Sequence, residues 1–130
     1  MSRAVRYQRF GGPEVLELRE IAEPHAAPGE VRVRVTAAGL NPMDWQIAAQ
    51  PDMAARFGIA LPAGFGSDFA GVVDEVGAAA TGFAVGDRVY GAAIGRSVAD
   101  FVLVGTPTAH LWPIPEASGT RWRPRFRCPV

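Results

Sequence analysis

The sequence predicts a mainly β protein, folded as a partly open β-barrel with short helical insertions. Three observations support this fold class: several short runs rich in β-branched and aromatic residues, dense Gly and Pro turn signals between them, and a single clear helix signal. At 130 residues, 48% of them hydrophobic, the chain has room for one domain with its own core.

The clearest strand signal is an alternation of apolar and polar residues, in the order Val31-Arg32-Val33-Arg34-Val35-Thr36. This period of two is typical of a half-buried strand, with the valines on one face. Shorter β-rich runs predict further strands at residues 4–10, 15–21, 69–76, 88–91 and 98–104. Tight turns are expected between them, at residues 11–13, 28–30 and 85–87, where Gly and Pro favour the required backbone conformations.

The helix signal begins at Asn41. Asn is a favoured N-cap residue, Pro42 suits the first helical position, and Asp44 lies in the first turn, near the positive end of the helix dipole. We therefore expect a helix that runs to about Gln50. Residues 51–66 are rich in Ala, Pro and Gly, and a further helical turn followed by a loop stays open there.

Composition excludes several classes of partner. The 13 basic and 13 acidic residues cancel, so the net charge favours neither nucleic acid nor an anionic membrane. No stretch approaches the ~20 apolar residues that span a bilayer, and the N-terminus lacks an apolar signal region. The single cysteine, Cys128, fits a reducing compartment. We expect a cytoplasmic protein without nucleic-acid or membrane partners.

The last residues differ from the rest of the chain. We expect the domain to cover residues 1–118 and an irregular basic tail to cover 119–130, which holds four of the arginines and two prolines. Arginines interleaved with aromatic residues are compatible with nucleic-acid binding. A truncated or out-of-frame terminus without a role is the alternative that we favour.

A series of motifs runs collinearly along the chain: G-G-P-E-V-L at 11–16, G-E-V-R-V-R-V at 29–35, A-A-G-L-N-P-M-D-W at 37–45, G-S-D-F-A-G-V-V at 66–73, V-G at 76–77, G-D-R-V-Y-G at 86–91 and S-V-A-D-F at 97–101. In order and spacing they resemble the zinc-independent quinone oxidoreductase branch of the medium-chain dehydrogenase/reductase superfamily. The resemblance covers about residues 3–116, and a collinear set is more specific than any single motif.

This resemblance implies a GroES-like alcohol dehydrogenase N-terminal domain. In the family it is followed by a Rossmann domain that binds NADPH, and the enzyme passes hydride to a quinone or an activated enone; the full-length enzyme is a possible homodimer. No strand followed by G-x-G-x-x-G occurs in these 130 residues. We therefore expect the Rossmann domain to be absent and the isolated chain to be inactive.

The resemblance also bears on metal binding. In the zinc-dependent branch a cysteine stands in place of Asn41 and a histidine in place of Ser67. Neither residue here offers the thiolate or imidazole of a catalytic zinc site, so we expect no metal. His25 and His110 are interpreted as loop residues rather than ligands.

Asn41 is the candidate catalytic residue, because without a metal a quinone carbonyl must be polarised by neutral hydrogen-bond donors such as its amide. The resemblance implies that cofactor-binding residues gather here: Asn41, Pro42, Trp45 and Gln46. Several family members carry an aromatic residue in place of Gln46, which leaves the subfamily open. Phe65 and Ser67 are candidates for the substrate wall.

Five further residues are expected to support the fold rather than to react. Asp44 and Asp68 lie in a helix's first turn and in a turn before a strand, where carboxylates commonly hold the backbone. Gly71, Gly86 and Asp87 belong to the strand and turn motifs of the family.

Three functions from different classes stay open. The chain is a fragment of an oxidoreductase, acting on a quinone, an enone or an enoyl thioester; a stand-alone GroES-like binding or oligomerisation module; or a translation product without function. The module reading lacks a long polar loop ending in an apolar anchor. Family motifs record ancestry and do not by themselves separate the first and third readings.

Overall fold

The computed structural model describes residues 1–106 and 110–115. The strands of the described part are β1 Ser2–Tyr7, β2 Glu17–Ile21, β3 Glu30–Gly39, β4 Ala63–Gly64, β5 Asp68–Val76, β6 Arg88–Ala92, β7 Phe101–Gly105 and β8 Leu111–Pro113. The helices are the 3-10 turn η1 Pro13–Val15, α1 Pro42–Ala49 and α2 Pro51–Arg56.

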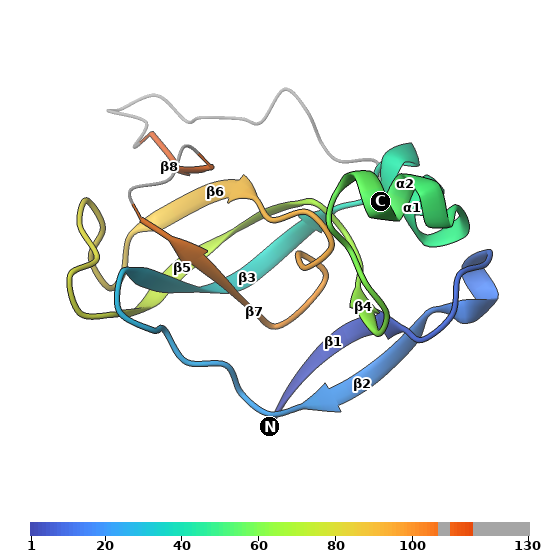
Figure 1. Ribbon diagram of the computed structural model, residues 1–130. Helices are drawn as coiled ribbons and strands as arrows, with labels where there is room; N and C mark the ends of the chain where they lie inside the picture. Colours follow the sequence, from blue (N-terminus) through green and yellow to red (C-terminus); the bar gives the residue numbers. More distant parts are fainter. Residues whose placement is uncertain (107–109, 116–130) are drawn as a thin grey trace.

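The strands form two antiparallel sheets. A three-stranded sheet has the order β2-β1-β4, and a five-stranded sheet has the order β7-β3-β5-β6-β8. Figure 1 shows the two sheets facing different ways, with α1 and α2 together at one end of the molecule. The curled, mainly β arrangement with few helices confirms the predicted fold class.

Two clusters of buried side chains form the core. The larger cluster lies on one face of the five-stranded sheet, where the period of two brings β-branched residues to the same side: Val31, Val33, Val73, Val89 and Val102 are all at most 2% exposed. The second cluster joins the smaller sheet to α1, and Tyr7, Ala48 and Phe65 are its members from β1, α1 and the residue after β4. Each sheet thus has its own core, and α1 packs against that of the smaller sheet.

The residues just before β7 connect the two sheets. Val98 O accepts a hydrogen bond from Val5 N–H at 2.9 Å, and Asp100 N–H donates to Arg3 O at 2.8 Å, so this segment is bound to β1. Asp100 O accepts from Val35 N–H in β3 at 2.9 Å. The sequence predicts a strand that begins at residue 98. In the structure residues 98–100 pair with both sheets, and β7 itself begins at Phe101.

Other boundaries differ for local reasons. The strand predicted at 15–21 begins at Glu17, because Pro13–Val15 forms a 3-10 turn. The strand predicted from the alternation at 31–36 continues to Gly39, and the stretch left open at 51–66 contains α2. The sequence did not predict β4 and β8, which have two and three residues and so carry almost no periodic signal.

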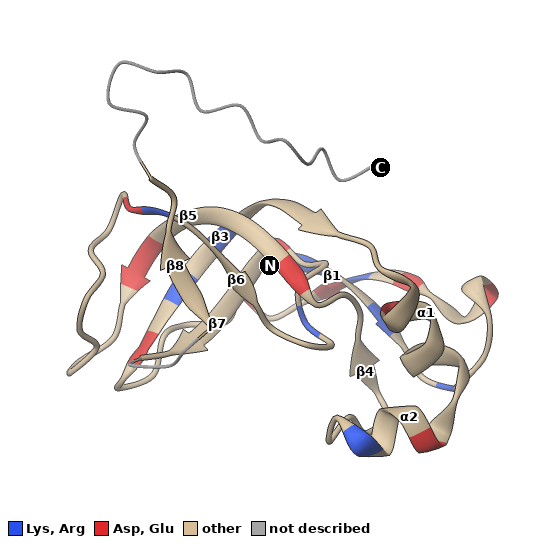
Figure 2. Cartoon of the chain, turned by 90° about the horizontal axis from the view of Figure 1, so that it is seen from above, with Lys and Arg blue, Asp and Glu red and all other residues tan. Residues whose placement is uncertain are grey.

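Charged residues of both signs are interspersed over the chain (Figure 2). Within the described residues, no helix is long and apolar enough to cross a membrane. The predicted domain boundary at 118, the tail 119–130 and Cys128 lie outside the described residues.

Candidate functional site

The site begins where β3 passes into α1. Asn41 is the N-cap residue of α1, with extended backbone, and Pro42 opens the helix as predicted. Asp44, in the first turn, accepts a hydrogen bond from Asn41 N–H on Oδ2 at 3.0 Å, which forms half of a capping box. These contacts within the first turn stabilise the start of α1.

Strand register brings a second segment to the same place. Gly39 of β3 pairs with Asp68 of β5, so the residues that follow β3 and precede β5 lie next to each other. Asn41 Nδ2 donates to Asp68 Oδ2 at 2.8 Å, and Ser67 Oγ donates to Asp44 Oδ1 at 2.5 Å. We name these four residues, Asn41, Asp44, Ser67 and Asp68, the polar cluster.

Burial divides the polar cluster into two layers. Asp44 and Ser67 are each only 3% exposed, whereas Asp68 is exposed and Asn41 is half-buried. The buried Asp44 carboxylate thus accepts hydrogen bonds from both Asn41 and Ser67, and Asn41 is the more exposed partner. The sequence predicted the Asn41 amide as a hydrogen-bond donor. One of its N–H groups donates to Asp68, which leaves the second N–H for another acceptor.

The predicted cofactor-binding residues share one surface of the first helical turns. Pro42 and Gln46, four positions apart, are exposed, and Trp45 is 37% exposed beside them. The Trp45 ring packs against Phe65, with 4.9 Å between the ring centroids and 58° between the planes. Phe65 itself is only 3% exposed, so the Trp45 indole packs on the buried side against the core of the smaller sheet.

The substrate-wall residues lie deep in the isolated chain. Phe65 belongs to the core of the smaller sheet, and Ser67 is held by Asp44. Neither presents appreciable surface to solvent, so their contact with a substrate stays a prediction.

The remaining predicted residues lie away from the polar cluster. Gly71 is at the middle of β5, where a Cβ would collide with the carbonyl oxygen of Arg34 on β3. Gly86 has a positive φ of 98°, and Asp87 Oδ2 accepts from Ala84 N–H at 2.8 Å in the turn before β6. Their positions agree with roles in backbone geometry.

Comparison with known proteins identifies the domain. The family described as the alcohol dehydrogenase GroES-like domain matches residues 27–116. The chain belongs to this family. The fold class and the resemblance predicted from the motifs are therefore confirmed.

Relatives of the GroES-like domain are quinone oxidoreductases. One from Pseudomonas aeruginosa is 43% identical over 93 residues, which are 68% of this chain and 26% of that protein. The human protein is 38% identical over 115 residues, 87% of this chain and 34% of its own. A quinone oxidoreductase structure from Pseudomonas syringae matches with a TM-score of 0.76 and 31% identity, covering 90% of this chain and 34% of that one. The GroES-like domain thus spans about a quarter to a third of these relatives.

Metal-ligating side chains are scattered in the described part of the GroES-like domain. No three His, Cys, Asp or Glu side chains gather there as a metal site would require. Asn41 and Ser67 hydrogen-bond to carboxylates instead. That the domain binds no catalytic zinc follows from the residue types at positions 41 and 67 and stays a prediction.

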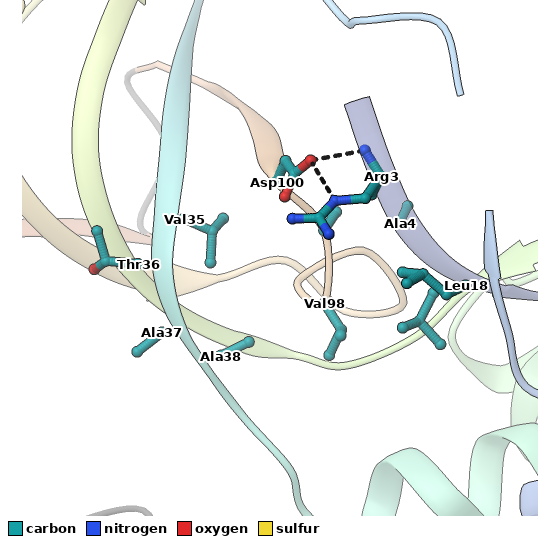
Figure 3. Close-up of a pocket in the computed structure, with 11 residues that line it drawn as sticks. Arg3, Ala4, Leu18, Val35, Thr36, Ala37, Ala38, Val98 and Asp100 are labelled. Atoms are coloured by element: carbon teal, nitrogen blue, oxygen red, sulfur yellow. Dashed lines mark hydrogen bonds and ion pairs between the residues drawn. The ribbon is translucent and has the colours of Figure 1, made fainter. Parts of the chain in front are cut away.

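Two cavities lie outside the polar cluster. One, of about 290 Å³, lies between β1, Leu18 of β2 and the end of β3, with the Arg3–Asp100 pair on its wall (Figure 3). Another, of about 500 Å³, lies between β1, the segment before β4 and the loop between β6 and β7. Asn41 and the predicted cofactor-binding residues line neither.

The sequence missed a charged cluster on the outer face of β3. Arg32, only 8% exposed, donates from Nε and Nη2 to the two carboxylate oxygens of Asp74 at 2.9 and 3.2 Å and from Nη1 to Glu23 at 3.2 Å. Its guanidinium also lies 4.3 Å from the centre of the Phe101 ring. Alternation placed Arg32 opposite the core but did not indicate that three separate segments cover it.

These contacts shift two ionisation equilibria. The hydrogen bond to Asp74 raises the pKa of Arg32, although burial opposes the shift. Hydrogen bonds from His25 and from Ala26 N–H hold the pKa of Glu75 below its ordinary value, and the Arg32 charge adds to this. The cluster therefore binds residues 23–26 to the sheet through charge as well as backbone contacts.

Proposed function

We propose that the chain is the substrate-side domain of an NADPH-dependent quinone or enone oxidoreductase that transfers hydride without zinc. The observation that carries the proposal is the polar cluster, in which a half-exposed Asn41 amide stands on a buried Asp44–Ser67 pair at the N-terminus of α1. The identity with quinone oxidoreductases supports it.

The surface of α1 fits a nicotinamide cofactor. Pro42 and Gln46 are exposed and flank the partly exposed Trp45 indole, so an apolar ring and a polar amide are available side by side. Asn41 and Gln46 would hold polar groups of the bound NADPH, which supplies the hydride. The positive end of the helix dipole at Asn41 favours a partly negative oxygen there.

Asn41 has the chemistry to act on the acceptor. With one amide N–H fixed by Asp68, the other is oriented before a ligand arrives, and an oriented donor stabilises charge that develops on a quinone oxygen. Asp44 sets the position of Asn41, and Ser67 holds Asp44 through its hydroxyl. In this scheme Phe65 and Ser67 also form part of the wall beside the substrate. We further propose that these 130 residues alone do not turn over NADPH, because they contain no G-x-G-x-x-G turn.

A chimera tests this function. The N-terminal part of the Pseudomonas aeruginosa quinone oxidoreductase is replaced by residues 1–115 of this chain, and NADPH oxidation with 1,4-benzoquinone is measured. We expect turnover that a zinc chelator does not reduce, and a loss of kcat/KM on the order of 100-fold in the Asn41→Ala chimera. A folded chimera that binds NADPH but reduces no quinone contradicts the proposal. Turnover by the 130-residue chain alone contradicts the predicted inactivity.

A further inference from the structure

The larger cavity, of about 500 Å³, has the size of a small-molecule site. Its walls come from β1, the segment between α2 and β4, the loop between β6 and β7, and β7 itself. None of the polar cluster lines it, so nothing in the proposed function uses it.

Much of the wall is apolar. Phe57 and Ile94, each 39% exposed, line the cavity together with Ile59, which packs against the core of the smaller sheet. Phe101 and Val98 also line the cavity. Such a surface favours an alkyl chain, because every methylene removed from water contributes to binding.

Two arginines, Arg6 and Arg96, also line the cavity. Arg6, from β1, donates from Nη2 to Pro62 O at 3.4 Å, and Arg96, from the loop after β6, donates from Nη1 to Leu103 O at 3.0 Å. Each hydrogen bond uses one of the five N–H donors of a guanidinium group. The bond orients the group, and its other N–H donors remain available to a ligand.

No acid neutralises these two arginines within the described residues. Neither Arg6 nor Arg96 takes part in an ion pair there, and no Asp or Glu is among the residues that line the cavity. Arg3, Arg19 and Arg32 each contact a carboxylate, whereas Arg9, Arg34, Arg56 and Arg88 resemble Arg6 and Arg96 in making no ion pair within the described residues. Because Arg6 and Arg96 both line the cavity and no carboxylate does, a negatively charged occupant would complement its wall.

We propose that this cavity binds an amphipathic carboxylate, with the head group held by Arg6 and Arg96 and the alkyl chain against Ile59, Ile94 and Phe101. Guanidinium groups bind carboxylates through parallel N–H bonds, which gives this head group an advantage over a neutral alcohol. The absence of lining carboxylates disfavours a cationic or metal-ion occupant.

Titration of the isotope-labelled chain with decanoate, followed by amide NMR, tests the site. We expect saturable shifts at residues 4–6, 57–60 and 94–96 and none at 41–46. Affinity should rise roughly fourfold per added methylene from hexanoate to decanoate. Decanol should bind about tenfold more weakly than decanoate.

Variants distinguish specific binding of the carboxylate head group from nonspecific hydrophobic binding. Arg6→Gln and Arg96→Gln should each weaken decanoate binding about tenfold and leave decanol binding unchanged. Arg88→Gln, at an exposed arginine of β6 that does not line the cavity, is the matched control and should bind decanoate like the parent chain. The ligand-free amide spectrum shows whether each variant is folded, and Arg96→Gln, in an exposed loop, tests the site if Arg6→Gln unfolds.

The proposal would be overturned by equal affinity for decanol and decanoate, by an unchanged decanoate affinity in folded Arg96→Gln, or by shifts confined to residues outside the cavity. The absence of saturable shifts at millimolar decanoate would do the same.

Discussion

Ser67 and Asp44 are 23 positions apart in sequence, yet the Ser67 hydroxyl donates to Asp44 Oδ1 at 2.5 Å in the interior of the domain. The other oxygen of the same carboxylate accepts from Asn41 N–H. One buried side chain thus holds the start of α1 against the start of β5, and the position of the Asn41 amide depends on it.

Removal of Asp44 should therefore destabilise the domain. We expect Asp44→Ala to lower the free energy of unfolding by about 2–3 kcal/mol, because it deletes two hydrogen bonds and leaves a buried hydroxyl without its acceptor. Ser67→Ala should cost about 1 kcal/mol, since one bond is lost. Urea unfolding followed by circular dichroism measures both. Equal costs for the two variants would contradict the central position of Asp44.

Two glycines should differ in what they tolerate. Gly71→Ala should destabilise by about 1–3 kcal/mol, because the new Cβ meets the backbone carbonyl of Arg34 inside the sheet. Gly86→Ala has open space around its Cβ, so its cost of about 1 kcal/mol comes from the positive φ alone. Gly86→Asn, which tolerates this conformation better, should recover part of that loss, whereas no side chain rescues position 71. Thermal unfolding of the three variants distinguishes steric from conformational cost.

Arg32 should contribute more to stability than its neighbour Arg34 on the same face. Arg32→Met leaves the carboxylates of Glu23, Asp74 and Glu75 facing one another without their shared cation. Arg34 is exposed and serves as the matched control, so Arg34→Met should change the unfolding midpoint little. Arg32→Lys should not restore stability, because a single ammonium cannot reproduce the bidentate contact with Asp74. A fully stable Arg32→Lys variant would contradict this account.

Glu75 should make stability depend on acid pH. Its pKa is lower in the folded chain than in the unfolded one, so its contribution is complete above the ordinary glutamate pKa of about 4.3 and is lost as pH falls through the lowered folded value. Glu75→Gln should abolish this part of the pH dependence and reduce stability at neutral pH. Urea titrations of both chains between pH 7 and pH 3 give the comparison. Parallel curves across that range would show that Glu75 is not responsible.

Local signals carried the correct sequence predictions. The valine alternation at 31–35 identified β3 because the period of two needs only neighbouring residues. The helix start at Asn41 was predictable for the same reason, since Asn41, Pro42 and Asp44 act within one turn.

Contacts between distant segments were not predictable in this way. That Gly39 pairs with Asp68 depends on strand register, and a slip of one residue would turn every side chain of β5 to its other face. Family resemblance pointed to Asn41 and Ser67, but neither pattern nor resemblance indicated that Asp44 would join them or that Asp68 would occupy one amide N–H. The three carboxylates around Arg32, those of Glu23, Asp74 and Glu75, likewise come from segments that only the folded sheet brings together.

The backbone pairing of Arg3 with Asp100 spans 97 residues of sequence. β1 therefore obtains one of its neighbours only after about a hundred further residues have been joined. Such long-range pairing slows folding and exposes unpaired strand edges in the meantime. We expect substitutions at positions 98–100 to change the refolding rate more than the unfolding rate. We also expect the nascent chain to be most prone to aggregation before residues 98–100 emerge from the ribosome.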